Sequence, residues 1–325
     1  MTTEATIKKR RLGQTEIEVT PIGLGGNKFS GGKGMTRVMY PEISQEQVNA
    51  IVKAALDGGI NWFDTAELYG GGHSEQALAT ALDAVRRRDD EVVVATKWSP
   101  FFRTAGNIPR TIDRRLHRLR EYTIDLYMVH MPLGLSSREA EMDAMADLVE
   151  AGKIRSVGVS NFGAEQMRRA HAALEKHGLP LAVNQVQYNL LQRTMETNGV
   201  LDAAKDLGVT IIAWGPLASG VLTGKFHKAP ERLKQVPIAR RITLRRNLER
   251  SRPLIRALQE MAAAYRVTPA QIALNWLVNF HGEMVVAIPG ASRARHAEQS
   301  ASSMKLRLAD EEMARLDELS REFRS

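Results

Sequence analysis

Short apolar runs alternate along the chain with longer segments in which apolar residues recur every three or four positions. A short apolar run bounded by polar residues is typical of a buried parallel strand, and the longer pattern is typical of an amphipathic helix. The predicted strands are residues 21–25, 60–64, 91–96, 124–130, 154–159, 182–187, 209–214 and 284–288. The predicted helices are residues 44–58, 74–87, 109–121, 137–151, 164–177, 197–207, 251–265 and 268–280.

Serine and glycine residues at the predicted helix ends agree with this periodicity. Ser44 followed by Gln47 fits a capping box, and Ser74 is predicted to cap the second helix. Glycine follows several helical segments, as a C-terminal cap requires, at positions 58, 152, 178 and 208. Two independent signals, the apolar pattern and the residues at the helix ends, therefore predict the same alternation of strands and helices.

Two segments lie outside the alternation. Residues 11–19 predict an N-terminal β-hairpin that turns near Gly13. Residues 218–250, rich in Lys and Arg, form a long irregular stretch after the seventh strand, and connections of this length are usually functional or disordered.

Eight strands, each followed by a helix, predict an α/β fold of the (β/α)8 (TIM) barrel type. No composition break separates residues 20 and 309, so residues 1–325 are predicted to form one domain.

The composition narrows the function classes. Hydrophobic residues make up 43% and charged residues 25%, which is an ordinary globular balance. Because the chain has no cysteine, it has no disulfide framework, no thiolate-bound metal and no cysteine nucleophile. The N-terminal residues lack the apolar core of a signal peptide, and no apolar stretch reaches membrane-spanning length. A soluble, cytoplasmic protein without a membrane partner is expected.

The net charge of +8 points to an anionic partner. Arginines of the helix at 109–120 are interleaved with Ile112, Leu116 and Leu119, and this spacing predicts a solvated face opposite a buried one. These arginines are Arg110, Arg114, Arg115, Arg118 and Arg120. No zinc-finger or RNA-binding signature accompanies them, so a phosphate-bearing small molecule is favoured over nucleic acid.

Two glycine-rich stretches fail as nucleotide-binding motifs. Residues 23–28 begin like a dinucleotide fingerprint, but Lys28 occupies the place of the third glycine. Residues 27–34 resemble a phosphate loop, but Asn27 replaces the first glycine, and Gly34 replaces the Ser or Thr that would hold Mg²⁺. No His-Glu-x-x-His is present, and no metal site is expected. Five histidines without ligand spacing are expected at the surface: 117, 171, 177, 281 and 296.

Four ionisable side chains are predicted at the ends of successive strands: Asp64, Tyr69, Lys97 and His130. The C-terminal edge of a parallel sheet is where chemistry takes place in α/β proteins. Alone, each residue has an ordinary structural explanation, such as a packed aromatic, a turn cap or a core histidine. All four at one rim are better explained as a proton-transfer site.

The four groups suit one task. A phenol has an ordinary pKa of about 10, and a neighbouring ammonium lowers it by stabilising the phenolate. A carboxylate keeps that ammonium charged and oriented, and an imidazole adds a second hydrogen bond to the same substrate oxygen. Such a site protonates a carbonyl oxygen while a hydride reaches the carbon, or runs the reverse reaction.

The motifs around these residues resemble those of the aldo-keto reductase superfamily over nearly the whole chain. The matching segments, in order, are residues 63–70, 95–97, 129–132, 158–162, 184–189, 214–225 and 288–290. The resemblance implies a (β/α)8 barrel and NADPH-dependent reduction of aldehydes and ketones without a metal. It implies that Tyr69 is the general acid, that Lys97 and Asp64 tune it, and that His130 orients the carbonyl.

The resemblance also implies cofactor positions. They are Gly25, Gly26, Asn27, Ser160, Asn161, Gln185, Trp214, Gly215, Pro216, Leu217, Gly220, Lys225, Ser292, Arg293 and Gln299. Ser160, Asn161 and Gln185 match the positions that hold the nicotinamide carboxamide, and Trp214 matches an aromatic on which the ring stacks. Ser292 and Arg293 suit a 2′-phosphate at a helix N-terminus, although His296, Gln299 and Ser300 depart from commoner residues. NADPH is therefore expected over NADH.

Substrate contacts and competing functions stay open. Trp98, Phe29, Met131 and the loop 98–108 are candidates for the wall of an apolar pocket, which would suit bulky carbonyl compounds, but a packing role is equally compatible with each. Residues 27–41 are expected over the same mouth. A second function class is an NADP-binding regulatory subunit resembling potassium-channel β-subunits, and a third is a basic nucleic-acid-binding barrel. A homo-oligomer also stays open.

Overall fold

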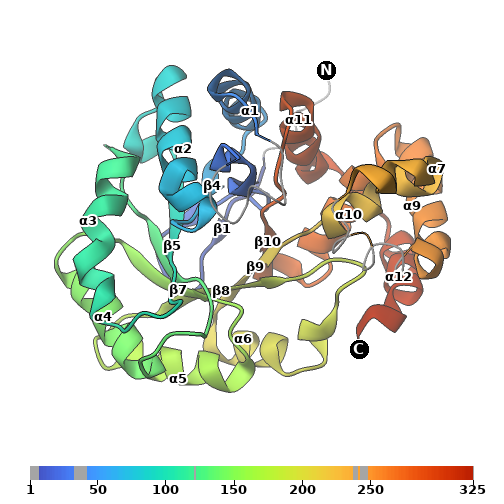
Figure 1. Ribbon diagram of the computed structural model, residues 1–325. Coiled ribbons are helices and arrows are strands. Elements are labelled where there is room, and N and C mark those ends of the chain that lie inside the picture. Colours follow the sequence, from blue (N-terminus) through green and yellow to red (C-terminus); the bar gives the residue numbers. More distant parts are fainter. Residues whose placement is uncertain (1–6, 33–41, 121, 237–240, 242–247, 325) are drawn as a thin grey trace.

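The computed structural model describes residues 7–32, 42–120, 122–236, 241 and 248–324. Eight parallel strands lie side by side in chain order, with helices around them (Figure 1). The strands are β3 (Leu24–Gly25), β4 (Trp62–Asp64), β5 (Val93–Trp98), β6 (Leu126–Val129), β7 (Ser156–Ser160), β8 (Leu181–Gln187), β9 (Thr210–Trp214) and β10 (Val285–Ala287). Each lies within a few residues of a predicted strand.

The first and last strands meet and close the sheet. Parallel bridges join Ile22 to Ala287 and Gly25 to Gly290, and Gly23 N donates to Ala287 O at 2.8 Å. A side chain at Gly25 would stand 2.9 Å from Ile288 O, so glycine permits this close approach. The predicted (β/α)8 barrel is confirmed.

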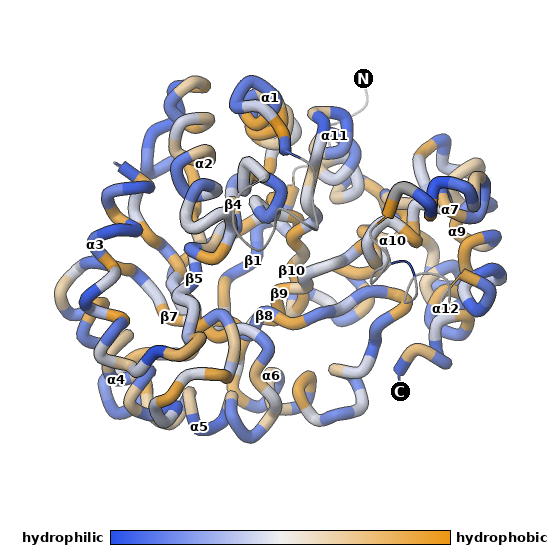
Figure 2. Tube along the Cα trace, in the orientation of Figure 1, coloured by the Kyte–Doolittle hydropathy of each residue, from blue (hydrophilic) through white to orange (hydrophobic). Residues whose placement is uncertain are grey.

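Successive strand residues face opposite sides of the sheet and build two apolar layers. One side faces the barrel interior, where Trp62, Met128 and Ile212 pack together. The other side packs beneath the helices and includes Phe63, Tyr127 and Ile211. In Figure 2 the hydrophobic colours follow the strands, and hydrophilic colours are frequent on the outer sides of the helices.

The predicted helices are all present. They are α1 (Gln45–Asp57), α2 (His73–Ala84), α3 (Asn107–Leu119), α4 (Arg138–Glu150), α5 (Ala164–Glu175), α6 (Val200–Leu207), α9 (Arg252–Tyr265) and α10 (Pro269–Asn279). Helix α11 (Ala294–Ser302) follows β10 and begins directly after Arg293, where a helix N-terminus was expected. Helix α12 (Asp310–Leu319) was not predicted. Among the described helices, none combines the length and the apolar character that a bilayer crossing requires.

Of the two predicted serine caps, the one at Ser44 is confirmed and the one at Ser74 is wrong. Ser44 Oγ accepts from Gln47 N, and Ser44 N donates to Gln47 Oε1 at 2.9 Å, so the capping box of α1 is confirmed. Ser74 is not a cap, because α2 begins at His73 after three left-handed glycines, 70 to 72. Its buried hydroxyl instead donates to Gly26 O at 2.7 Å and ties α2 to the end of β3.

The predicted hairpin is formed by β1 (Arg10–Arg11) and β2 (Glu18–Val19). Leu12 and Val19 pack against the barrel interior, and Gly13 N donates to Thr210 Oγ1 at the start of β9. The hairpin therefore covers the end of the barrel at which the strands begin. The opposite end, where the strands finish, is left for the loops.

The long stretch after β9 differs from its prediction. Residues 218–235 are not irregular but form three short helices, η6 (Ala218–Thr223), α7 (Lys225–Lys228) and η7 (Pro230–Gln235). Residues 237–240 and 242–247 of the same stretch lie outside the described residues. So do residues 33–41 of the segment expected over the barrel mouth.

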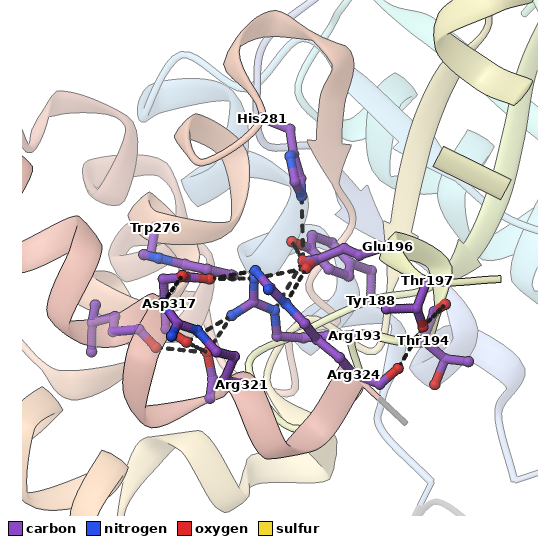
Figure 3. A network of polar contacts seen from close by, with 12 residues as sticks. Tyr188, Arg193, Thr194, Glu196, Thr197, Trp276, His281, Asp317, Arg321 and Arg324 are labelled. Atoms are coloured by element: carbon purple, nitrogen blue, oxygen red, sulfur yellow. Dashed lines mark hydrogen bonds and ion pairs between the residues drawn. The ribbon is translucent and has the colours of Figure 1, made fainter. Parts of the chain in front are cut away.

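A polar network fastens α12 to the loop after β8 (Figure 3). Arg193 is completely buried, and its Nη2 donates to Glu196 Oε2 at 2.7 Å and to Asp317 Oδ1 at 2.6 Å. Its guanidinium lies 4.9 Å from the centre of the Trp276 ring. His281, expected at the surface, is mostly buried and contacts Glu196 at 3.3 Å in the same network.

Candidate active site

The strand register places the four predicted proton-transfer residues at the C-terminal edge of the sheet. Asp64 is the last residue of β4 and pairs with Ala95, so Lys97 stands two residues further along β5. His130 directly follows β6, and its N donates to Trp98 O at 3.0 Å. Tyr69 begins the short helix η3 (Tyr69–Gly72) in the loop after β4. All four residues therefore lie where the strands finish.

Lys97 and Asp64 form a buried ion pair. Lys97 Nζ donates to Asp64 Oδ2 at 2.6 Å and to Thr65 O at 2.9 Å, and the two side chains are 0% and 1% exposed. Burial lowers the pKa of Lys97, and the Asp64 carboxylate acts in the opposite direction. A buried amine needs such a partner to remain charged.

Tyr69 and His130 complete the group. Lys97 Nζ lies 5.2 Å from the centre of the Tyr69 ring, and the Tyr69 and His130 rings meet edge to face with centroids 5.7 Å apart. Burial, together with the charge of Lys97, lowers the pKa of His130 to about 3. The imidazole is therefore neutral at physiological pH and suited to hydrogen bonding rather than to carrying charge.

The residues predicted to hold the nicotinamide form one hydrogen-bonded chain. Trp214 Nε1 donates to Asn161 Oδ1 at 3.0 Å, and Asn161 Nδ2 donates to Ser160 Oγ at 3.0 Å. Ser160 Oγ in turn donates to Gln185 O at 2.9 Å. Asn161 has a φ of 62°, an uncommon conformation for a residue other than glycine and one that often marks a functional site.

The hydrogen-bonded residues from Trp214 to Gln185 are linked to the buried ion pair through Gln185. Gln185 Nε2 donates to Asp64 Oδ1 at 2.8 Å, so Asp64 is shared between Lys97 and Gln185. Asn161 Nδ2 also donates to His130 O at 3.2 Å. The sequence predicted two separate half-sites, whereas the structure connects them through the two oxygens of one carboxylate.

A group of lysine and arginine side chains lies near His296 on α11. Around the half-buried His296, burial and then the charges of Lys28, Arg295, Arg293 and Lys225 lower the pKa of its imidazole. Arg293 is the residue before α11, and none of its side-chain atoms caps that helix. Ser292 Oγ lies 3.4 Å from His296 Nδ1. Lysines and arginines from three parts of the chain therefore surround the first turn of α11.

The loop after β3 and the loop after β9 border this basic region. A side chain at Gly290 would stand 3.0 Å from Asn27 Oδ1, and one at Gly220 would stand 2.8 Å from Lys225 Nζ. Ala218 and Ser219 have φ values of 47° and 58°, so the η6 backbone is strained beside Gly220. The other predicted cofactor positions in these loops are Gly25, Gly26, Gly215, Pro216 and Leu217, while Gln299 lies further along α11.

The proposed substrate residues differ in exposure. Trp98 and Phe29 are 0% and 1% exposed and pack in the core, whereas Met131 is half-buried. The large apolar side chains most exposed among the described residues are Phe102, which lies in the candidate loop 98–108, and Leu133 and Leu135, which were not candidates. They follow β5 and β6, the strands that carry Lys97 and precede His130, and Leu135 N donates to Arg103 O at 2.9 Å.

Sequence reasoning missed a second buried charge cluster beside the site. Arg115 was expected on a solvated face but is 2% exposed and pairs with Glu67 and Glu75. A signal was present, because residues 108, 112, 115 and 119 of α3 share one helix face and the other three are apolar. Glu67 also lies inside the motif that contains Asp64 and Tyr69.

Comparisons with known proteins agree with this geometry. The model of the Aldo/keto reductase family matches residues 21–321. The chain is 30% identical to pyridoxal reductase, chloroplastic, of Arabidopsis thaliana, over 94% of this chain and 84% of that protein. The chain therefore belongs to the aldo/keto reductase family.

Two solved structures share the fold. A thermostable aldo-keto reductase, Tm1743, in complex with the inhibitor epalrestat, superposes with a TM-score of 0.78 at 30% identity, covering 96% of this chain and 99% of that one. An aldo-keto reductase from Klebsiella pneumoniae in complex with NADPH gives a TM-score of 0.72 at 28% identity, covering 97% and 95%. The chain is therefore an oxidoreductase of this family by sequence and by fold.

Proposed function

We propose that this protein reduces aldehydes or ketones to alcohols with NADPH and that Tyr69 is the general acid. The observation that supports this most strongly is the buried Lys97–Asp64 ion pair behind the Tyr69 ring, with a neutral His130 at the ring edge. A lysine held in this way favours phenolate over phenol. Tyr69 can then give its proton to a carbonyl oxygen at neutral pH.

Each of the four residues has one part in this proposal. Tyr69 donates the proton, and the Lys97 ammonium stabilises the phenolate that remains. Asp64 holds Lys97 in place through the 2.6 Å hydrogen bond. His130 donates an imidazole N–H to the carbonyl oxygen and so orients the substrate. Its Nδ1 is buried without a partner among the described residues, which suits a site built to receive another polar group.

The residues also fit a nicotinamide dinucleotide phosphate. The half-buried Trp214 and the polar chain from Asn161 to Gln185 suit an aromatic ring with a carboxamide. The cations around the start of α11 suit phosphate groups, and Arg293 with Ser292 would hold the 2′-phosphate. When bound, NADPH supplies the hydride. The complex of a relative with NADPH supports this choice of cofactor.

The test is an NADPH-oxidation assay against a panel of aldehydes, ketones, quinones and sugars. In Tyr69→Phe, we expect the rate on the best substrate to fall by roughly 10²- to 10⁴-fold, the usual contribution of a general acid. The affinity for NADPH should stay within about twofold, because the acid acts on the substrate. A wild type that binds NADPH tightly but reduces no carbonyl would instead support a regulatory NADP-binding subunit.

A second test addresses the choice between NADPH and NADH. Arg293→Ala should weaken NADPH binding by roughly ten- to a hundredfold, since a charged hydrogen bond contributes about 1.5–3 kcal/mol. NADH, which lacks the 2′-phosphate, should be almost unaffected. Dissociation constants from fluorescence titration measure both effects. Arg114→Ala, which removes the same charge from the exposed face of α3, is the control. Equal weakening of both cofactors by Arg293→Ala would place the 2′-phosphate elsewhere.

A further inference from the structure

Glu67 is a buried carboxylate on the segment that carries Tyr69. It lies two residues before Tyr69, and its side chain is 8% exposed. Burying a carboxylate is unfavourable unless charged and hydrogen-bonded partners surround it. The proton-transfer scheme gives Glu67 no part, yet the fold supplies it with partners from the loop after β5 and from α3.

Glu67 contacts Lys97 itself, Ser99 two positions further along the chain, and two arginines. Its main-chain N donates to Lys97 O at 3.3 Å, and its Oε1 accepts from Ser99 N at 2.5 Å. The same oxygen accepts from Arg103 Nη1 at 2.7 Å, while Oε2 accepts from Arg115 Nη1. Glu67 therefore fastens the Tyr69 segment to the end of β5, where Lys97 lies.

Arg115 also forms an ion pair with a second buried carboxylate, that of Glu75. Its Nε lies 3.2 Å from Oε2 of the fully buried Glu75, whose other oxygen accepts from Thr96 Oγ1 at 2.7 Å. Although burial acts to lower it, the Glu75 and Glu67 carboxylates raise the pKa of Arg115, so its charge is permanent. Because Thr96 precedes Lys97 on β5, the network begins and ends on the strand that carries the catalytic lysine.

We propose that Glu67 is a positioning residue, which fixes the segment of residues 65–69 against β5 and thereby sets the Tyr69 hydroxyl for proton transfer. This inference rests on the proposed function of Tyr69. Proton transfer depends steeply on geometry, and a displacement of about 1 Å can lower a rate by about a hundredfold. Cofactor affinity depends on residues of other loops. Loss of Glu67 should therefore lower kcat and leave NADPH binding intact.

Glu67→Gln is the informative variant, because it keeps the size of the side chain. Its amide oxygen can still accept from Ser99 N, but its NH2 group must then face a guanidinium, donor against donor. We expect kcat to fall at least tenfold at a temperature where the variant is fully folded. The KM for the carbonyl should change by less than about threefold and the Kd for NADPH by less than about twofold.

Asp317→Asn is the matched control. Asp317 is also a mostly buried carboxylate shared between arginines, but it lies on α12 in the network of Figure 3. Its loss should lower the thermal midpoint and leave kcat within about twofold. If Glu67→Gln behaves in the same way, with a lower midpoint and an unchanged kcat, Glu67 is structural only and the inference is overturned.

A spectroscopic readout separates this inference from the proposed function. The chain has six tyrosines, so the Tyr69 signal in a protein labelled with ¹³Cζ-tyrosine can be assigned by its absence in Tyr69→Phe. The signal should shift in Glu67→Gln and not in Asp317→Asn. An unchanged signal overturns the positioning role even in an active enzyme. A shifted signal in a protein that reduces no carbonyl supports the positioning and contradicts only the proposed function.

A second variant covers the case in which Glu67→Gln does not fold. The Arg103 side chain is 37% exposed, so Arg103→Met removes one donor to Glu67 without opening the core. It should shift the same Tyr69 signal and lower kcat several-fold. If neither the signal nor kcat changes in Arg103→Met, the inference is overturned.

Discussion

At the scale of single residues, the side chains at this site are controlled by burial as much as by their own chemistry. Lys97 has no exposed surface. Asp64 forms an ion pair with Lys97 through one carboxylate oxygen and accepts a hydrogen bond from Gln185 with the other. The sequence could place Asp64 and Lys97 at strand ends because an ionisable residue there interrupts an apolar pattern. It could not reveal that one carboxylate links both halves of the site, because that contact joins residues 121 positions apart.

Arg115 shows how a residue can be misread. Charged residues on an amphipathic helix usually face solvent, and Arg110 and Arg114 do so. Arg115 instead takes a place on the apolar stripe of α3, since the carboxylates of Glu67 and Glu75 are buried beneath it. The partners of a buried charge come from distant segments, and helical periodicity carries no information about them.

The neutral state of His130 predicts a dependence of stability on pH. Its pKa is lowered to about 3 in the folded protein, against an ordinary value of 6.5. Between pH 7 and 5, the imidazole takes up a proton only in the unfolded chain, so the free energy of unfolding falls as the pH falls. This one group should remove about 2 kcal/mol over that interval.

The measurement is urea unfolding of wild type and His130→Asn at pH 7 and pH 5. Other titrating groups, such as the buried Glu141, are present in both proteins and cancel in the comparison. The wild type should lose about 2 kcal/mol more than His130→Asn on acidification. An equal loss in the two proteins would mean that His130 takes up its proton in the folded state as readily as in the unfolded chain.

At the scale of elements, the sequence predicted those that an apolar face fixes. The eight strands and the eight predicted helices bury regular stripes, and their limits agree with prediction to within a few residues. Helix α12 was missed because Leu316 is its only buried residue and ion pairs of Asp317 fasten it. The start of α2 was misplaced because three left-handed glycines, rather than a serine cap, precede it.

The loops were the least predictable elements. The sequence left Trp98 and Phe29 open between a substrate wall and a packing role, and both pack in the core. Phe102 reaches solvent in the loop 98–108, which was a candidate without any one residue being singled out, and Leu135 was not predicted. Phe102 is 92% exposed and has a φ of 56°, a combination that only the folded loop determines.

At the scale of the whole molecule, the barrel and its C-terminal helices are joined by polar as well as apolar contacts. The hairpin covers one end of the barrel, so the other end alone offers strand ends and loops for chemistry. Arg193, from the loop after β8, binds Asp317 of α12 and so connects segments 124 residues apart. The buried guanidinium resists separation of these parts, because leaving it unpaired is unfavourable.

This connection predicts that residues 1–325 unfold as one unit, as expected of a single domain. Wild type should show one cooperative transition in urea by both fluorescence and far-ultraviolet circular dichroism. Asp317→Asn removes one charged partner of Arg193 and should lower the free energy of unfolding by roughly 1–3 kcal/mol, with the transition still single. The surface pair of Arg315 and Glu260 provides the control, since Glu260→Gln should change the free energy by less than about 1 kcal/mol. An early separate transition in Asp317→Asn would show that α12 detaches first and that the C-terminal part folds as a second unit.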